Sequence, residues 1–354
     1  MTPPNKIQLW RALFRPLFIC PLFIVYMITT SHVHAEQKDY TEKDFSHWLN
    51  AAYIAQATYE STNELPDLLD KHGYTQTQSQ EIKGYAISYT FATNDETKRH
   101  ILAVRGTANV ENVMVDVAFV LIPDVLSGID IHQGFLLSSQ GIYQQVKPVI
   151  KPGYKIDTIG HSLGGAAALI LAMMLDAQGY PVDKVITFGQ PKVTNITGSR
   201  KFEHLNITRL VTDKDLVPLV PPVDPMDLMK LSIFWHQGTE IVLYPDNRYS
   251  VLTGISSMRR VTDFLNEIPS QQHLNNHYMS TYVQYIKAKL ESPEEVEYKS
   301  DFSFSDWFGK YSTILACVFD EGRVAQYFNN VSLTTPFLLA GPSIQPYVLS
   351  VRRC

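Results

Sequence analysis

The sequence predicts an α/β fold with a mainly parallel central sheet flanked by helices. Between residues 83 and 289, stretches with strand patterning alternate with helical stretches, an order that favours parallel strands joined by helices. Hydrophobic residues make up 45% of the 354, enough to bury a large core in one domain. The third observation is a strand, a tight turn and a helix in direct succession at residues 154–177.

The first 35 residues are predicted to be a signal peptide. A head with three basic residues precedes an apolar stretch at 16–30, and small residues at the two recognition positions place cleavage after Ala35. The apolar stretch is shorter than the ~20 residues that a membrane-spanning helix needs. We therefore expect a secreted or periplasmic protein, with an uncleaved N-terminal membrane anchor as the alternative.

Charge and cysteine content restrict the classes of partner. Removal of residues 1–35 takes away three positive charges and no acids, so the formal net charge moves from −5 to −8. This acidity argues against binding to nucleic acid and against simple electrostatic docking on anionic lipid. Cys317 and Cys354 remain, either as a disulfide or as two free thiols. No metal-ligand spacing is present, and we expect no cofactor and no metal.

Each further element has its own signal in the sequence. Helical spacing of apolar residues after Thr41, with Asp44 three residues on as a capping box, predicts a helix within 41–60. Alternation, turn residues and helix formers predict the other elements. The predicted strands are 83–93 and 100–104 as a hairpin, 154–159, 184–189, 208–212 and 241–244, and the predicted helices are 136–149, 166–177, 261–268 and 273–289. A charged stretch at 291–299 sets the expected domain boundaries, 36–291 for the α/β domain and 292–354 for a C-terminal extension of unknown role.

The turn between the predicted strand and helix at 154–177 is Gly160-His161-Ser162-Leu163-Gly164-Gly165. A strand that reverses into a helix over so few residues strains the backbone of the central Ser162, and the flanking glycines leave room where side chains would collide. The helix start aims N–H groups and a positive dipole end at negative charge that forms beside the serine. This pattern is typical of a nucleophile elbow.

A serine nucleophile needs a base, and the base needs an acid that orients it. In an elbow fold the chain order is serine, acid, histidine. Asp215 is the best placed acid because it follows a predicted strand in a proline-stiffened loop, and Asp213, Asp224 and Asp227 are alternatives. His277 is the preferred base because it lies near the end of the predicted domain, before a helix, with His236 and His273 as the other candidates.

Six short motifs in order resemble the class 3 lipases, fungal-type lipases of the α/β-hydrolase fold. The resemblance runs from about Asp44 to Lys289. Its parts are Arg105-Gly106-Thr107 with Asp116 behind it, His132-Gln133-Gly134-Phe135, Gly160 to Gly165, Thr187 to Val193, Asp215-Leu216-Val217-Pro218, and His277-Tyr278-Met279-Ser280-Thr281-Tyr282.

The resemblance implies a role for each matched residue. Ser162 would be the nucleophile, His277 the general base and then acid, and Asp215 its orienting acid. The oxyanion hole would consist of the N–H of Leu163 with the N–H and hydroxyl of Thr107. The chain departs from the family pattern in two places, with Met114 where a lid tryptophan is usual and Asn276 where an acidic residue commonly precedes the histidine.

These observations predict hydrolysis of acyl esters of glycerolipids, as a triacylglycerol lipase or a phospholipase A-type enzyme. The apolar stretch 110–126 would be a lid that covers the site and contacts a lipid interface transiently, or else part of the core, and residues 226–235 could add an apolar rim. A carboxylesterase for soluble substrates is the nearest alternative. A lipase-like binding or scaffold protein without catalysis is the alternative from another class.

Overall fold

The computed structural model describes residues 39–60, 64–85, 87–106, 120–221, 233–258, 260 and 270–299. Several predictions from the sequence concern residues outside these ranges: the signal peptide, Thr107, Asp116, most of the 110–126 stretch, Asp224, Asp227, the helix at 261–268 and the two C-terminal cysteines. Within the described residues, no helix is both long enough and apolar enough to span a membrane.

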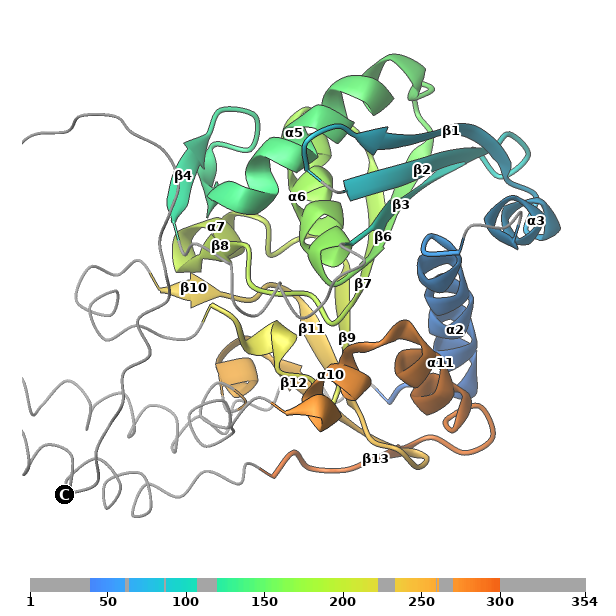
Figure 1. Cartoon of the computed structure of the whole chain (residues 1–354), viewed down its shortest axis with the longest axis vertical. Coiled ribbons are helices and arrows are strands. Elements are labelled where there is room, and N and C mark those ends of the chain that lie inside the picture. Colours follow the sequence, from blue (N-terminus) through green and yellow to red (C-terminus); the bar gives the residue numbers. More distant parts are fainter. Residues whose placement is uncertain are drawn as a thin grey trace, which may run out of the picture. The chain divides into compact units, whose positions relative to one another are not determined.

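A mostly parallel sheet forms the centre of the fold, which confirms the predicted α/β class (Figure 1). Its strand order is β1-β2-β3-β6-β7-β9-β11-β12-β13, with parallel pairing from β3 through β11. The bounds are β1 Thr75–Ile82, β2 Ile87–Asn94, β3 Arg99–Arg105, β6 Lys155–His161, β7 Val182–Phe188, β9 Ile207–Thr212, β11 Thr239–Leu243, β12 Arg248–Thr253 and β13 Glu294–Glu295. Because the central strands are parallel, their carboxyl ends meet at one edge, where ligands bind in such sheets.

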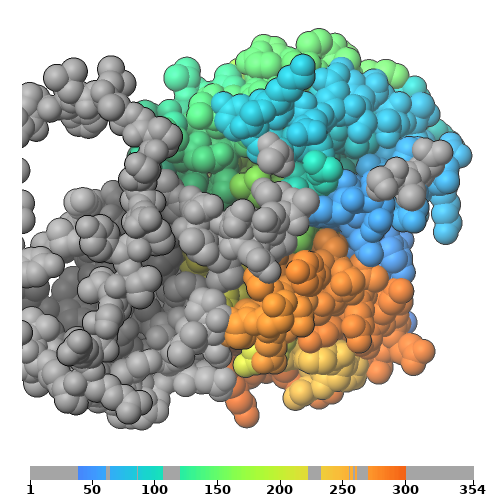
Figure 2. Space-filling model, in the orientation of Figure 1, coloured from blue at the N-terminus to red at the C-terminus, as the bar shows by residue number. Residues whose placement is uncertain are grey.

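Helices cover both faces of this sheet (Figure 1). On one face lie α5 (Gln133–Val146) and α6 (Leu163–Ala177), and α6 is apolar on every side because it packs between the sheet and α5. On the other face lie α2 (Glu42–Ala57) and α11 (Met279–Lys287), whose surfaces adjoin in Figure 2. The predicted capping box of α2 is present, since the carboxylate of Asp44 accepts the Thr41 N–H at 2.8 Å.

A second, antiparallel sheet has the order β10-β8-β5-β4. Its strands are β10 Phe234–Trp235, β8 Thr194–Asn195, β5 Ile129–His132 and β4 Leu121–Asp124. Strand β4 lies within the apolar stretch that the sequence suggested as a lid, so this part of the stretch is a strand paired in full with β5. The described end of the stretch is therefore part of the scaffold.

Short elements complete the described chain: α3 Glu64–Lys71, α7 Ile196–Lys201, α10 Gln271–His277 and the 3₁₀ turns Lys147–Val149, Val217–Leu219 and Gly254–Met258. Strand β1 was missed by the sequence reading because it is polar on both faces, and the structure places it at an exposed edge of the sheet. Strand β13 pairs with β12 beyond residue 291, so the chain still contributes to the sheet past the expected boundary.

Candidate active site

Ser162 lies at the turn between β6 and α6, with φ 57° and ψ −129°. This sparsely populated backbone region costs of order 1–3 kcal/mol, so the strain expected from the sequence is present. The glycines are required by close backbone packing. A Cβ on Gly160 would lie 2.3 Å from the Gly164 carbonyl oxygen, and a Cβ on Gly164 would lie 2.3 Å from the carbonyl oxygen of Val104 on the neighbouring strand β3.

Asp215 follows β9 by three residues and is completely buried. Its carboxylate accepts three hydrogen bonds. Oδ2 accepts from His277 Nδ1 at 2.7 Å and from the hydroxyl of Tyr282 at 2.5 Å, and Oδ1 accepts the N–H of Val217 at 2.9 Å. The three donors leave neither oxygen of the charged form unpaired and hold the carboxylate in one orientation.

Burial alone would raise the pKa of Asp215, but its surroundings reverse that effect. The charge of His277 and the hydrogen bonds from His277, Tyr282 and Val217 together hold the pKa of Asp215 below its ordinary value. The acid is therefore ionised at neutral pH and accepts hydrogen bonds only. It follows that Nδ1 of His277 carries the proton in their hydrogen bond, which leaves Nε2 as the basic nitrogen when the ring is neutral.

Nε2 of His277 and Oγ of Ser162 have the same, uncommon hydrogen-bonding environment. Both atoms are buried, and neither has a hydrogen-bond partner in the part of the chain that the structure describes. Buried polar atoms without partners are rare in folded proteins and occur at functional sites. In apo structures the hydrogen bond between a nucleophile and its base is often long and shortens only with substrate.

The three residues converge at the carboxyl end of β7. The N–H of Ser162 donates to the carbonyl oxygen of Phe188, the last residue of β7, at 2.9 Å. A Cβ placed on the next residue, Gly189, would lie 2.8 Å from both Asp215 Oδ2 and His277 Cε1. Gly189 has φ 57°, so both its conformation and its surroundings require glycine. One residue of this strand end thus contacts the serine backbone, and the next contacts the acid and the histidine.

One half of the expected oxyanion hole falls within the described residues. Leu163 is the first residue of α6, and the first N–H groups of a helix have no acceptor within the helix. The positive end of the helix dipole lies at the same place. Thr107 lies outside the described residues, and the chain is described as far as Gly106.

The alternative acids and bases occupy other positions. His236 donates from Nε2 to the carbonyl oxygen of Pro218 at 2.6 Å, and burial keeps its pKa well below the ordinary value, so the ring is neutral. His273 accepts the N–H of Ser270 on Nδ1 and caps the start of α10. Asp213 has one buried oxygen, Oδ1, without a hydrogen-bond partner among the described residues, and burial raises its pKa. Of Asp213 and Asp215, it is Asp215 that accepts the hydrogen bond from Nδ1 of His277.

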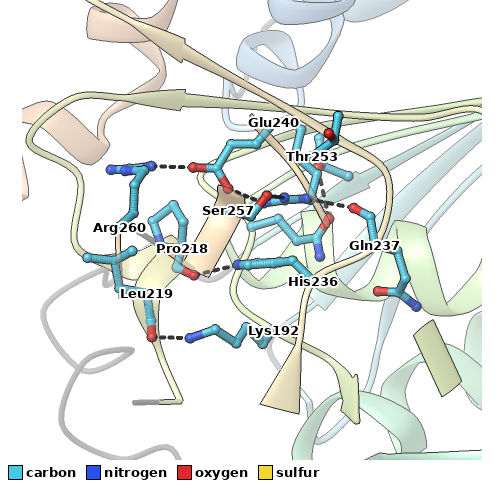
Figure 3. Close-up of polar contacts among 12 residues, drawn as sticks. Lys192, Pro218, Leu219, His236, Gln237, Glu240, Thr253, Ser257 and Arg260 are labelled. Atoms are coloured by element: carbon cyan, nitrogen blue, oxygen red, sulfur yellow. Dashed lines mark hydrogen bonds and ion pairs between the residues drawn. The ribbon is translucent and has the colours of Figure 1, made fainter. Parts of the chain in front are cut away.

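A buried charged cluster supports the loop that carries Asp215 (Figure 3). Glu240 pairs with Arg209 at 2.6 Å and with Arg260 at 2.9 Å, and all three side chains are at most 2% exposed. Burial would raise the pKa of Glu240, but the two guanidinium charges hold it below its ordinary value. Arg260 also donates to the carbonyl oxygen of Asp215 itself, at 3.3 Å.

Lys192 extends this support to the far end of the loop. Its ammonium group donates to the carbonyl oxygens of Leu219 and Pro221, and burial lowers its pKa to about 7. Together with Arg260 on Asp215 and the neutral ring of His236 on Pro218, Lys192 binds the main chain of the loop at four carbonyl oxygens (Figure 3). The sequence reading missed this cluster because its members are far apart in the chain.

Comparison with known proteins gives a consistent result. Residues 101–224 match the family model "Lipase (class 3)". This segment of the chain is similar to the class 3 lipases. Secreted mono- and diacylglycerol lipase 1 of Fusarium solani is 31% identical over 145 residues, which cover 37% of this chain and 42% of that protein. A lipase of Rhizopus oryzae is 33% identical over 142 residues, 36% of each chain. The chain therefore aligns with less than half the length of these relatives.

Among solved structures, the Rhizomucor miehei triacylglyceride lipase superimposes with a TM-score of 0.51 at 22% identity, covering 58% of this chain and 82% of that one. The likeness shows a shared fold. Among the residues that the structure describes, no group of three or more His, Cys, Asp or Glu side chains is arranged to hold a metal ion.

Proposed function

We propose that the protein is a serine hydrolase that cleaves acyl esters of glycerolipids through an acyl-enzyme on Ser162. The observation that carries the proposal is the arrangement at the end of β7. The backbone of Ser162, whose buried hydroxyl has no partner among the described residues, contacts Phe188, and the next residue, Gly189, packs against His277 and the ionised Asp215 bound to its Nδ1. This arrangement matches the chemical needs of a serine nucleophile.

In the first half of the reaction, Nε2 of His277 takes the proton from Oγ of Ser162 as the oxygen attacks the ester carbonyl carbon. The N–H of Leu163 donates to the oxyanion that forms. Asp215 stabilises the positive charge on the imidazole ring through the 2.7 Å hydrogen bond to Nδ1. The tetrahedral intermediate then expels the alcohol, which takes the proton from Nε2, and the acyl group stays on Oγ.

In the second half, water replaces the alcohol. His277 removes a proton from water as it attacks the acyl carbon, and the ester bond to Ser162 breaks when Nε2 returns a proton to Oγ. Thr107 supplies the second oxyanion donor, next to Gly106 at the end of the described β3 segment. Loss of one such donor lowers the rate by about 10²–10³.

The names of the relatives support an acylglycerol as the substrate, since they include mono- and diacylglycerol lipases and a triacylglyceride lipase. The word "secreted" in two of these names supports export of this chain after cleavage behind Ala35. The contact with lipid is transient and is made by apolar surface beside the site. A soluble-ester carboxylesterase uses the same triad and differs only in the pocket.

The test is hydrolysis of a series of esters, from short soluble chains to emulsified triacylglycerol, diacylglycerol and a phospholipid. Wild-type protein, Ser162→Ala and a control, Ser79→Ala on the exposed strand β1, are compared. We expect activity to rise with acyl chain length and when the substrate aggregates, and Ser162→Ala to lose ~10⁴-fold or more. Activity confined to short soluble esters would favour the carboxylesterase. Inactivity of the wild type on every ester would favour the scaffold protein.

A further inference from the structure

His161, the residue before the nucleophile, lies between the base and the N-terminal helix and has a partner on each ring nitrogen. Its Nε2 lies 2.7 Å from the carbonyl oxygen of His277, and its Nδ1 lies 2.9 Å from the hydroxyl oxygen of Tyr59. The hydroxyl of Tyr59, which lies just beyond α2, also accepts the N–H of Gly106 at 3.2 Å. These contacts join four separate segments of the chain around the site.

The chemistry of the partners sets the direction of each hydrogen bond. A carbonyl oxygen only accepts, so Nε2 of His161 carries a proton. Burial and the neighbouring charge of His277 lower the pKa of His161 to about 3, so the ring is neutral and its Nδ1 is an acceptor. Burial raises the pKa of Tyr59, so the phenol keeps its proton and donates it to Nδ1. The chain of hydrogen bonds therefore runs from the Gly106 N–H to the Tyr59 hydroxyl, from that hydroxyl to Nδ1 of His161, and from Nε2–H of His161 to the carbonyl oxygen of His277.

At one end of this chain of hydrogen bonds, His161 fixes the backbone of His277, the proposed base. Helix α10 ends at His277 because Tyr278 has an extended backbone, with ψ 141°. The last carbonyl oxygens of a helix lack partners within the helix. Here side chains cap three in succession: Thr281 donates to Asn275, Thr212 to Asn276 and His161 to His277. His161 is thus the cap on the residue that carries the base.

At the other end of the chain of hydrogen bonds, Tyr59 fixes the backbone of Gly106, the residue before Thr107. A Cβ on Gly106 would lie 2.7 Å from the carbonyl oxygen of His161 and 2.8 Å from the hydroxyl of Tyr59, so this part of the backbone packs directly against the elbow. Its N–H has Tyr59 as its acceptor. The next residue is Thr107, the proposed second oxyanion donor.

We propose that Tyr59 is a positioning residue for the reaction. It orients His161, which holds the backbone of His277, and it binds the N–H of Gly106 at the end of β3, so the two backbone segments keep a fixed relative position. The proposal rests on the proposed function of Ser162 and His277. Tyr59 does not contact the reacting atoms. Its effect is on geometry, and a small displacement of a base or an oxyanion donor lowers the rate more than it changes substrate binding.

The first experiment measures the hydrogen-bonding state of His161 in the wild-type protein by ¹⁵N NMR of the ring nitrogens. We expect a proton on Nε2 and an accepting Nδ1, whose resonance moves toward that of a free imine nitrogen in Tyr59→Phe. A proton on Nδ1 in the wild type, or no shift in the variant, would overturn the proposal. This measurement needs no turnover, so it is independent of the proposed enzymatic function.

The second experiment is a double-mutant cycle on kcat for a soluble ester, with Tyr59→Phe, His161→Phe and both together. We expect Tyr59→Phe to lower kcat about 10-fold with KM within about twofold, and to have little further effect once His161 is replaced. The matched control is Tyr53→Phe on the preceding helix α2, whose ring packs near Lys287, and it should match the wild type. Additive effects, or an unchanged kcat in Tyr59→Phe, would refute the positioning role. Absence of wild-type turnover with the NMR result intact would refute the proposed function and leave the hydrogen-bond chain standing.

Discussion

Replacement of Tyr282 by phenylalanine should weaken Asp215 without disturbing the packing of α11. The Tyr282 ring is fully buried, and it packs edge-on against Phe188 and His161 with ring centroids 5.9 and 6.0 Å apart. Phenylalanine keeps these contacts. The hydroxyl that it lacks donates to Asp215 Oδ2 at 2.5 Å and accepts the Thr212 N–H in a long contact of 3.4 Å.

The size of the effect follows from the charge on the acceptor. A hydrogen bond to a charged group contributes about 1.5–3 kcal/mol to stability. Because the Tyr282 hydroxyl stabilises the ionised form of Asp215, its loss should raise the pKa of Asp215 in Tyr282→Phe. Because the folded-state pKa of Asp215 is lowered in the wild type, its stabilising effect is complete above the unfolded value of about 3.9. That effect is lost as the pH falls through the folded-state pKa.

The assay is urea unfolding of the wild type and Tyr282→Phe at a series of pH values from 3 to 8. We expect the variant to lose about 1.5–3 kcal/mol at pH 7, with the difference shrinking below about pH 4. Tyr285→Phe is the control on the same helix, since its hydroxyl makes only a 3.4 Å contact with the neutral side chain of Asn276. A loss at pH 7 that persists unchanged at pH 3 would show that the hydroxyl does not act through the charge of Asp215.

Three further predictions concern the same region. Asp215→Asn should lower kcat by about 10⁴ in ester hydrolysis because an amide donor at this position favours the wrong tautomer of His277, and a loss below about tenfold would contradict this role. Gly164→Ala should reduce the free energy of unfolding, measured in urea, by about 1–3 kcal/mol, because its Cβ would lie 2.3 Å from the Val104 carbonyl oxygen. An unchanged urea midpoint would refute the packing argument. For Lys192, the folded-state pKa of about 7 lies below the unfolded value of about 10.4, so the unfolded chain binds more protons between these limits and stability should rise with pH across them. Lys192→Met should remove that rise, and parallel stability curves for the two proteins would count against it.

The parts of the fold with a strong local signal could be predicted from the sequence. The elbow was readable because a strand, a glycine-flanked serine and an apolar helix are consecutive in the chain. The structure confirms β6 and α6 around Ser162, with the helix beginning at Leu163 instead of Ala166. Strand β1 was not readable, since its residues are polar on both faces and alternate between Thr, Gln and Ser. This segment forms a strand because it pairs with β2, and its own sequence does not indicate that pairing.

For the candidate site, the sequence indicated which acid and histidine should pair, but it did not indicate the residues that support them. Asp215 and His277 could be chosen by chain order and motif, and the structure places them 2.7 Å apart. The role of Tyr282 could not be assigned, because a tyrosine five residues after a histidine is equally typical of a core helix position. Tyr59 belongs to a segment with an ordinary amphipathic pattern, and its contact with His161 spans 102 residues of sequence. Long-range contacts of this kind depend on how the helices pack on the sheet.

The central claim is that Ser162 is a nucleophile activated by His277. The most direct test is reaction of the wild-type protein and a His277→Gln variant with a fluorophosphonate ester, followed by peptide mass spectrometry and by the rate of labelling. We predict one adduct, on the peptide that contains Ser162, with labelling that is slower by orders of magnitude in a His277→Gln variant. Labelling at another residue, or a rate on Ser162 that is the same in His277→Gln, would contradict the account.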